Sequence, residues 1–273
     1  MSAKFRETFA LPATPPLDNL RAEPLTKNYS LVGTAFDYLL RFYLERLYPF
    51  AQAKYWIAES ALTCSILQNN KAIYKQVRTI VQTARELQTT YLQGGQITDE
   101  LLRACLLLAQ IDPIFRRSVI VPNFGHIDEC DIADLRNLIS LVTPETFPIR
   151  DICLLDPTFG AASLLVGGAD VDLVIDEAIV DIKTTINPKL QRKHFNQVLG
   201  YYILSRIGKI EGLPTNHCIC QIGVYSARFG ELYLFNVEKL ANEDTIRAFS
   251  RWFIDRAQQE FGTELAKLNS LLY

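Results

Sequence analysis

The stretch VGGADVDLVIDEAIVDIKTT, residues 166–185, contains two short apolar segments, DLVID and AIVDIKT, which meet at Asp176 and Glu177. Their length and their content of Val and Ile predict two strands joined by a tight hairpin. Strands this apolar usually lie inside a sheet, where an unpaired carboxylate is strongly unfavourable. The acidic side chains of the stretch therefore either face solvent or surround something that carries positive charge.

Two of these acids are expected to face each other across the hairpin. If the strands pair about Asp176 and Glu177, Asp172 lies nearly opposite Asp181, and Lys183 shares a face with Asp181. Two carboxylates this close repel each other unless a cation lies between them. Mg²⁺ prefers such oxygen ligands, and Lys183 is placed to hold an attacking water or stabilise a developing oxyanion. This combination suits phosphodiester hydrolysis.

The sequence around the hairpin predicts the other elements of an α/β protein. Strands are expected at 149–155, 218–226 and 230–237, a loop at 156–163, an amphipathic helix at 189–207 and a closing helix at 242–268. This order of strands and helices indicates a sheet of mixed direction. Upstream, helical spacing predicts helices at 33–48, 52–67, 71–92, 100–111 and 132–142, where Pro49 ends the first and Asp112-Pro113 ends the fourth.

These elements divide the chain into three predicted parts. Residues 1–28 contain several prolines and no periodicity, which predicts an extended arm. Residues 29–145 are expected to form a helical lobe, and residues 146–273 the strand-containing core with its closing helix.

Composition narrows the classes of function. The chain has 273 residues, 49% of them hydrophobic, and a net charge of −2, which argues against a surface coated with phosphate-binding groups. No apolar run approaches the roughly 20 residues that span a bilayer, and the first residues lack a hydrophobic signal core, so we expect a cytoplasmic protein with no membrane partner. The six cysteines form no C-x-x-C pair, which favours reduced, buried thiols.

The hairpin and the helix that follows it resemble the core of the PD-(D/E)XK nuclease superfamily, most closely its RecB-like branch. In that family an acidic residue in a G-x-x-D-L-V-like strand precedes a [DE]-x-K strand, and the branch adds Q-x-x-x-Y on the next helix. Asp172-Leu173-Val174, Asp181-Ile182-Lys183 and the pair Gln197 and Tyr201 match these motifs. The resemblance implies a restriction-endonuclease-like fold, with a mixed β-sheet core flanked by helices and an N-terminal helical lobe.

The resemblance also implies roles for these residues. Asp172 and Asp181 would bind Mg²⁺ or Mn²⁺ together with the backbone carbonyl of Ile182, and Lys183 would be the catalytic lysine. Gln197 and Tyr201 would position the substrate strand. The glycine of the first motif is Gly168, four residues before Asp172, so Asp170 remains the alternative metal ligand if the pairing slips.

Further site residues are expected on two helices. Members of the branch often carry G-x-x-x-H on an early helix, and here Gly33 is followed by Asp37, which would bind metal or orient water, or pair with Arg41. A basic strip could contact phosphate or simply form a solvated helix start; its members are Lys189, Arg192, Lys193 and His194. Arg228 lies in the last hairpin. It could contact phosphate, or the geometry of the turn alone could explain it.

The resemblance therefore implies a metal-dependent nuclease, with DNA favoured over RNA. An iron–sulfur cluster is not expected, because residues 221–273 contain no cysteine. One alternative is a non-catalytic nucleic-acid-binding or assembly subunit of a larger nucleic-acid-processing complex that keeps the fold. Another is a phosphohydrolase that acts on nucleotides.

Overall fold

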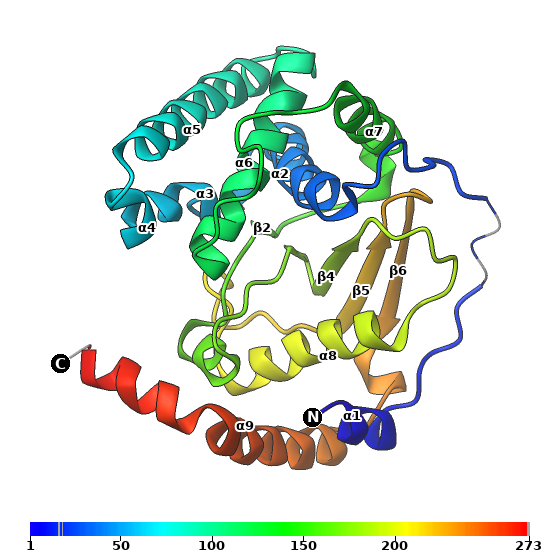
Figure 1. Cartoon of the computed structure of the whole chain (residues 1–273). Helices are drawn as coiled ribbons and strands as arrows, with labels where there is room; N and C mark the ends of the chain where they lie inside the picture. The colour runs from blue at the N-terminus through cyan, green and yellow to red at the C-terminus, as the bar shows by residue number, and fades with distance from the viewer. Residues whose placement is uncertain (16, 18, 272–273) are drawn as a thin grey trace.

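The structure, a computed structural model, describes residues 1–15, 17 and 19–271, which form three layers with a sheet in the middle (Figure 1). Six strands among these residues follow one another across the sheet in chain order. They are β1 (Gln52–Ala53), β2 (Cys153–Leu155), β3 (Leu173–Ile175), β4 (Ala178–Lys183), β5 (Gln221–Ser226) and β6 (Glu231–Asn236). The pairs β1–β2 and β4–β5 are parallel and the others antiparallel, so the predicted α/β class with a mixed sheet is confirmed.

Each face of the sheet packs against its own layer of helices. One face is covered by the helical lobe, whose main helices are α2 (Tyr29–Leu47), α5 (Lys71–Leu92), α6 (Asp99–Arg117) and α7 (Glu129–Ser140). The other face packs against α1 (Ser2–Thr8), α8 (Arg192–Ile207) and α9 (Glu243–Leu271). Alternation along β4 sends Val180 and Ile182 to the lobe and Ile179 to the α8 side, so Asp181 and Lys183 also point to the α8 side.

The register of the β3–β4 hairpin agrees with the prediction. Leu173 pairs with Val180 and Ile175 with Ala178, which leaves Asp176 and Glu177 as the two-residue turn. Asp176 adopts a positive φ of 45°, and its carboxylate accepts the backbone N–H groups of residues 150–152. This acid of the stretch is therefore structural, because it ties the turn to the segment that leads into β2.

The helix predicted over 52–67 is wrong. The segment instead contains β1, two short helices, α3 (Ile57–Ser60) and α4 (Ser65–Gln68), and a 3₁₀ turn at Ala61–Thr63. Gln52 and Ala53 pair with β2, and the buried Trp56 begins α3 with its N–H bound by the Glu59 carboxylate. Tertiary pairing and this local cap outweigh the helical spacing.

The helix over 71–92 is confirmed, whereas the predicted stop at Asp112-Pro113 is wrong. α6 continues through Pro113 to Arg117, and Ser118 ends it in the left-handed conformation. Ile114, beyond the proline, is fully buried, so packing holds the last turn of the helix despite the missing donor. The 156–163 segment also differs from the predicted loop, because a 3₁₀ helix occupies Gly160–Val166.

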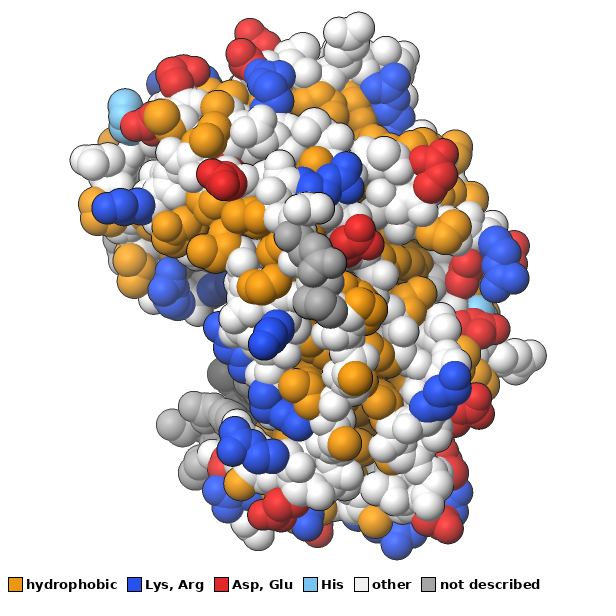
Figure 2. All heavy atoms as spheres, turned by 90° about the vertical axis from the view of Figure 1, so that its right-hand side faces the viewer, with side chains coloured by type: hydrophobic (Ala, Val, Ile, Leu, Met, Phe, Trp, Pro, Cys, Tyr) orange, Lys and Arg blue, Asp and Glu red, His pale blue; other side chains and the backbone are white. Residues whose placement is uncertain are grey.

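The N-terminal arm is extended only in part. It begins with α1, which the sequence did not predict, and whose Phe5 packs edge-on against Phe249 of α9 at 4.8 Å between ring centroids. The described part of the arm then follows the β6 side of the molecule, where Ala22 donates its N–H to the Arg228 carbonyl (Figure 1). Figure 2 shows this side, with hydrophobic side chains exposed between scattered basic and acidic ones.

Two expectations that came from the composition of the chain can be compared with the structure. The six cysteines are free thiols, as expected. Only Cys105 and Cys153 are buried, so the predicted burial is wrong for the other four. Three of these lie on the surface, at positions 130, 218 and 220. Among the described helices, none combines the length and the apolar character needed to cross a membrane.

Candidate functional site

Two carboxylates and an ammonium converge where β3 and β4 lie side by side. Asp172 precedes β3, and its Oδ2 accepts the backbone N–H of Ile182 at 2.6 Å. Asp181 in β4 is completely buried, and its Oδ2 lies 2.6 Å from Nζ of Lys183. The hairpin therefore brings together the acidic pair and the lysine that the sequence singles out.

The site is deficient in positive charge. Burial, Asp181 and Asp37 together raise the pKa of Asp172 well above its ordinary value. Burial also raises the pKa of Asp181, although Lys183 opposes this shift. Neither Asp181 oxygen accepts a hydrogen bond of good geometry from the described residues, and the buried Oδ1 of Asp37 accepts none either. The carboxylates here thus outnumber the two nearby cations, Lys183 and Arg41, in a low-dielectric environment, which favours binding of a further cation.

Asp37 reaches this group from the helical lobe. Gly33, one turn earlier on α2, lies against Thr184, and a Cβ on Gly33 would stand 2.7 Å from Thr184 Oγ1. A glycine is therefore needed to bring α2 close to the end of β4. Asp37 Oδ2 pairs with Arg41 Nη2 at 2.6 Å, so the predicted alternative of an ion pair with Arg41 is confirmed. The other carboxylate oxygen of Asp37, Oδ1, has no hydrogen-bond partner among the described residues.

Gln197 and Tyr201 of α8 line a cleft that Asp172 and Asp37 also line. Gln197 Nε2 donates a hydrogen bond to the Tyr201 hydroxyl at 2.7 Å. The Tyr201 ring stacks on Phe159 at 5.7 Å, and burial, Asp172 and Asp181 raise the pKa of the phenol. Tyr201 therefore stays protonated and can donate a hydrogen bond to an anionic group in the cleft.

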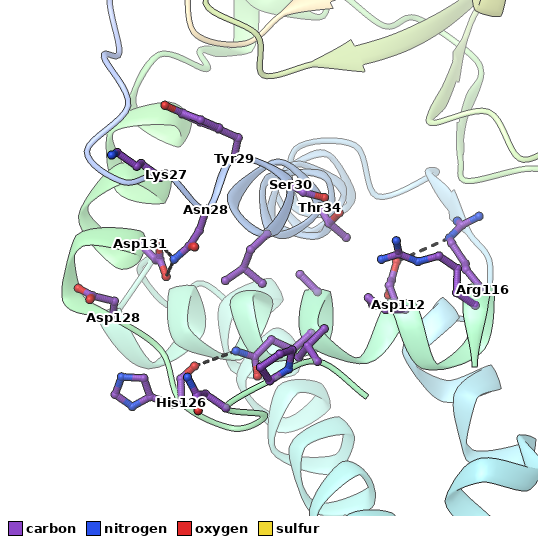
Figure 3. Close-up of a pocket in the computed structure, with 18 residues that line it drawn as sticks. Lys27, Asn28, Tyr29, Ser30, Thr34, Asp112, Arg116, His126, Asp128 and Asp131 are labelled. Carbon is purple, nitrogen blue, oxygen red and sulfur yellow. Dashed lines mark hydrogen bonds and ion pairs between the residues drawn. The ribbon is translucent and has the colours of Figure 1, made fainter. Parts of the chain in front are cut away.

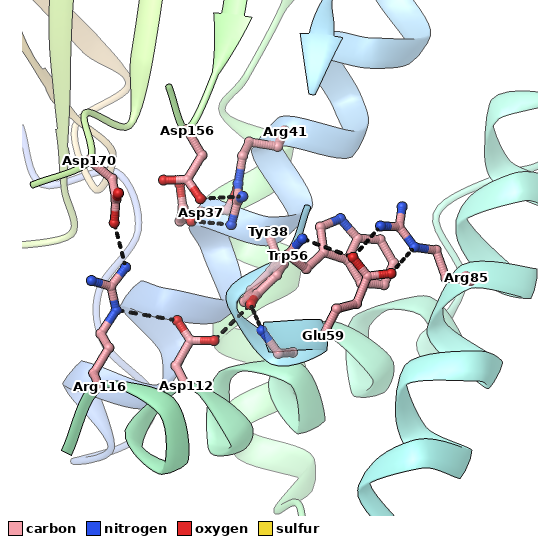
Figure 4. A network of polar contacts seen from close by, with 11 residues as sticks. Asp37, Tyr38, Arg41, Trp56, Glu59, Arg85, Asp112, Arg116, Asp156 and Asp170 are labelled. Atoms are coloured by element: carbon pink, nitrogen blue, oxygen red, sulfur yellow. Dashed lines mark hydrogen bonds and ion pairs between the residues drawn. The ribbon is translucent and has the colours of Figure 1, made fainter. Parts of the chain in front are cut away.

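The cleft has a volume of about 370 Å³. Figure 4 shows part of its wall, with Asp37, Arg41 and Asp156 side by side. Its wall includes Asp156, which the sequence analysis missed. Asp156 adopts a φ of 58°, donates its N–H to the Asp172 carbonyl at 3.0 Å and pairs through Oδ2 with Arg41 Nη1 at 3.2 Å. Burial raises the pKa of Asp156 to about 7. A strained backbone at a cleft residue is typical of functional sites.

Asp170 lies on the rim of the cleft and is held by a different partner. Its Oδ2 is 3.3 Å from Nη2 of Arg116, and Arg116 also faces Asp112, whose carboxylate accepts the Tyr38 hydroxyl at 2.7 Å (Figure 4). The hairpin register thus places Asp172, and not Asp170, beside Asp181.

The basic strip is divided between the site and the surface. His194 is half-buried, and burial together with Lys183 lowers its pKa to about 4, so it lies near the site as a neutral imidazole. Lys189 and Lys193 are exposed. Arg192 instead donates from Nη1 to the Phe9 carbonyl at 2.8 Å and packs on Phe195, so the structure uses its guanidinium to hold the N-terminal arm.

Arg228 does not reach the surface. It is completely buried, pairs with Asp134 of α7 and donates to the carbonyls of Ala22 and Thr184. The interpretation of Arg228 as a phosphate contact is therefore wrong, because its guanidinium is fully occupied inside the protein. Its bond to Thr184 instead fixes the residue that follows Lys183.

The donors at the site suit a hard cation in type and charge. Asp172 and Asp181 offer carboxylate oxygens, and Asp181 and Asp37 have oxygens that lack hydrogen bonds. Within the described residues, no three His, Cys, Asp or Glu side chains are close enough to form a complete metal-binding group. A ligand set here would therefore combine two carboxylates with backbone or water oxygens.

Replacing Asp172 with asparagine is expected to stabilise the metal-free protein at neutral pH by about 1 kcal/mol or more. The native pKa of Asp172 is raised, so the wild-type protein loses stability as the pH rises from the ordinary aspartate range through that raised value. Asparagine keeps an acceptor for the Ile182 N–H but carries no charge. Urea denaturation at pH 4 and pH 7.5 measures the difference, which should be larger at pH 7.5.

The exposed Asp151 supplies the matched control, since Asp151→Asn should change stability by less than about 0.5 kcal/mol. Mg²⁺ should raise the melting temperature of the wild type more than that of Asp172→Asn. A less stable Asp172→Asn protein at neutral pH without metal would contradict the description of this site as electrostatically strained.

Comparison of the chain with models of known protein families, with curated proteins and with solved structures finds no match.

Proposed function

We propose that this protein is a metal-dependent nuclease that hydrolyses phosphodiester bonds, with DNA favoured over RNA. The observation that carries the proposal is the convergence of Asp172, Asp181 and Lys183 on neighbouring strands, with buried carboxylate oxygens that lack hydrogen bonds. An arrangement of this kind binds a divalent cation and a phosphate together.

In this proposal, Asp172, Asp181 and the Ile182 carbonyl hold Mg²⁺ or Mn²⁺, with Asp37 next to them. When bound, the ion would supply Lewis-acid stabilisation of the phosphate charge and would lower the pKa of the attacking water. Lys183 holds that water and stabilises the charge that develops on the phosphate oxygens. Tyr201, whose phenol is protonated, and Gln197 bind a phosphate oxygen or the adjacent sugar and so fix the strand in the cleft.

Asp156 adds a titratable group to this scheme. Its pKa of about 7 lets it take up or release a proton near neutral pH, and its N–H bond to the Asp172 carbonyl fixes the main chain next to a proposed metal ligand. The fold proposed for the whole is restriction-endonuclease-like, with the cleft at the junction of the sheet, α8 and the helical lobe. The cleft is polar and lined by residues of the lobe, of α8 and of the segments that flank β2 and β3.

Metal-dependent cleavage by the purified chain tests the function. We expect Mg²⁺ or Mn²⁺ to support cleavage of labelled DNA, and we expect EDTA to abolish it. Binding of DNA without cleavage in either metal would point to the non-catalytic subunit, and hydrolysis of nucleotides but not of polymers to the nucleotide phosphohydrolase.

A further inference from the structure

A second and larger cavity opens in the helical lobe (Figure 3). Its volume is about 1100 Å³, and it lies between the start of α2, the end of α6 and the segment 121–131. This exceeds the size of most pockets for small molecules, which reach roughly 1,000 Å³. The volume suits several linked groups rather than one small ligand.

The large cavity continues the cleft along one face of α2. Ser30 and Thr34 line the cavity, and Asp37 and Arg41 line the cleft, so spacings of four, three and four residues place all of them on one side of the helix. Arg116 of α6 lines both spaces, as does Asp112. A ligand that extends from the cleft past Arg116 therefore enters the cavity.

The groups that this cavity offers suit an anionic, aromatic polymer. Lys27 and Arg117 are exposed and form no ion pair among the described residues, and Tyr29 is 54% exposed. The wall contains three acids. Asp131 is 2% exposed and binds the Asn28 amide, Asp112 binds Tyr38, and Asp128 is exposed and accepts the Cys130 N–H as the cap of α7. Besides the exposed Asp128 at the start of α7, the wall thus offers two exposed cations and an aromatic ring, the combination that binds single-stranded nucleic acid.

Burial of the catalytic groups favours a single strand over a duplex. Asp181 is completely buried, and Lys183 keeps only 20% of its side chain exposed. A duplex is stiff, with a persistence length of about 150 base pairs, so a flexible single strand bends into a narrow cleft at a lower cost in free energy. Its neighbouring nucleotides then need a path away from the cleft, and the cavity provides one.

We propose that the cavity between α2, α6 and residues 121–131 binds the nucleotides of a single strand that flank the phosphate held in the cleft. Tyr29 stacks on a base, and Lys27 and Arg117 bind phosphates. This inference rests on the proposed nuclease function, because the cleft fixes where the strand starts.

Binding of a fluorescent 12-nucleotide dT strand, measured by anisotropy in Ca²⁺, tests the cavity without reference to cleavage. Tyr29→Ala should weaken binding roughly 5- to 150-fold, as expected for the loss of one stacked base. The double variant Lys27→Gln/Arg117→Gln should also weaken binding. It should reduce the magnitude of the slope of log K against log[salt] by about 1.4, since each phosphate contact to a single strand contributes about 0.7 to that slope.

Arg78→Gln is the matched control, because Arg78 is exposed on α5 and does not line either cavity. It removes a positive charge from the lobe and should leave affinity and salt dependence close to those of the wild type. Thermal unfolding of each variant confirms that these exposed positions leave the fold intact.

A cleavage assay separates this inference from the proposed function. We compare kcat/KM for the 12-nucleotide strand with kcat/KM for a thymidine dinucleotide. The ratio of the two should fall in the cavity variants, Tyr29→Ala and Lys27→Gln/Arg117→Gln, and should stay at its wild-type value in Arg78→Gln. Wild-type affinity for the strand in both cavity variants would overturn the inference even if cleavage is observed, as would equal affinity for a duplex. Loss of binding in those variants with no cleavage by the wild type would support the cavity and refute the nuclease.

Discussion

Replacing Lys183 with methionine is expected to lower the rate of Mg²⁺-dependent cleavage about 10²- to 10³-fold, the usual loss when one stabilising donor is removed from an active site. Nζ of Lys183 lies 2.6 Å from Asp181 Oδ2, and 20% of the side chain remains exposed. Methionine fills a similar volume but neither donates a hydrogen bond nor carries charge. Single-turnover cleavage of a labelled strand at saturating enzyme measures this change in the chemical step.

The methionine variant also removes the counter-charge of a buried carboxylate, so its fold needs a separate check. Lys183→Arg keeps the positive charge but places it in a planar guanidinium that cannot reproduce the position of the ammonium. We expect Lys183→Arg to fold like the wild type and still to cleave slowly. Lys209→Met, at an exposed lysine after α8, removes a charge from the surface and should cleave normally. Wild-type rates for both Lys183 variants would refute the proposed site.

The hairpin could be predicted because residues close together in the sequence determine it. Two apolar segments separated by Asp176 and Glu177 favour one register, and the structure has that register, which places Asp172 beside Asp181. Gln197 and Tyr201 were singled out by the resemblance to the Q-x-x-x-Y motif, and helical spacing then places them on one face of their helix. Most of the proposed site thus comes from a short part of the chain in which local pattern and tertiary structure agree.

The parts that the sequence did not reveal depend on distant partners. Asp156 is in the site because Arg41, which lies far away in the chain, pairs with it and because its backbone adopts a positive φ. The dipeptide Asp156-Pro157 signals a turn but not its place beside Asp172. β1 forms because β2 lies next to it, and α6 passes Pro113 because Ile114 is buried. Such contacts leave no periodic signal.

Arg228 shows how such a distant contact supports the site. Its guanidinium pairs with Asp134 at 2.8 and 3.0 Å and donates to the Thr184 carbonyl at 2.9 Å and the Ala22 carbonyl at 3.1 Å. It therefore joins α7, the N-terminal arm and the end of β4 at one point. Because Thr184 follows Lys183, the position of the proposed catalytic lysine depends on this buried pair.

Arg228→Met is expected to lower the free energy of unfolding by about 3–5 kcal/mol, since it leaves the fully buried Asp134 without its counter-charge. Arg206→Met breaks the exposed pair with Glu243 and should cost no more than about 1 kcal/mol. Urea denaturation of both variants measures the difference. The double variant Arg228→Met/Asp134→Leu should recover much of the loss, because it removes the stranded charge as well. A loss below about 1 kcal/mol in Arg228→Met would mean that water or another group reaches Asp134, and that the pair does not fix the end of β4.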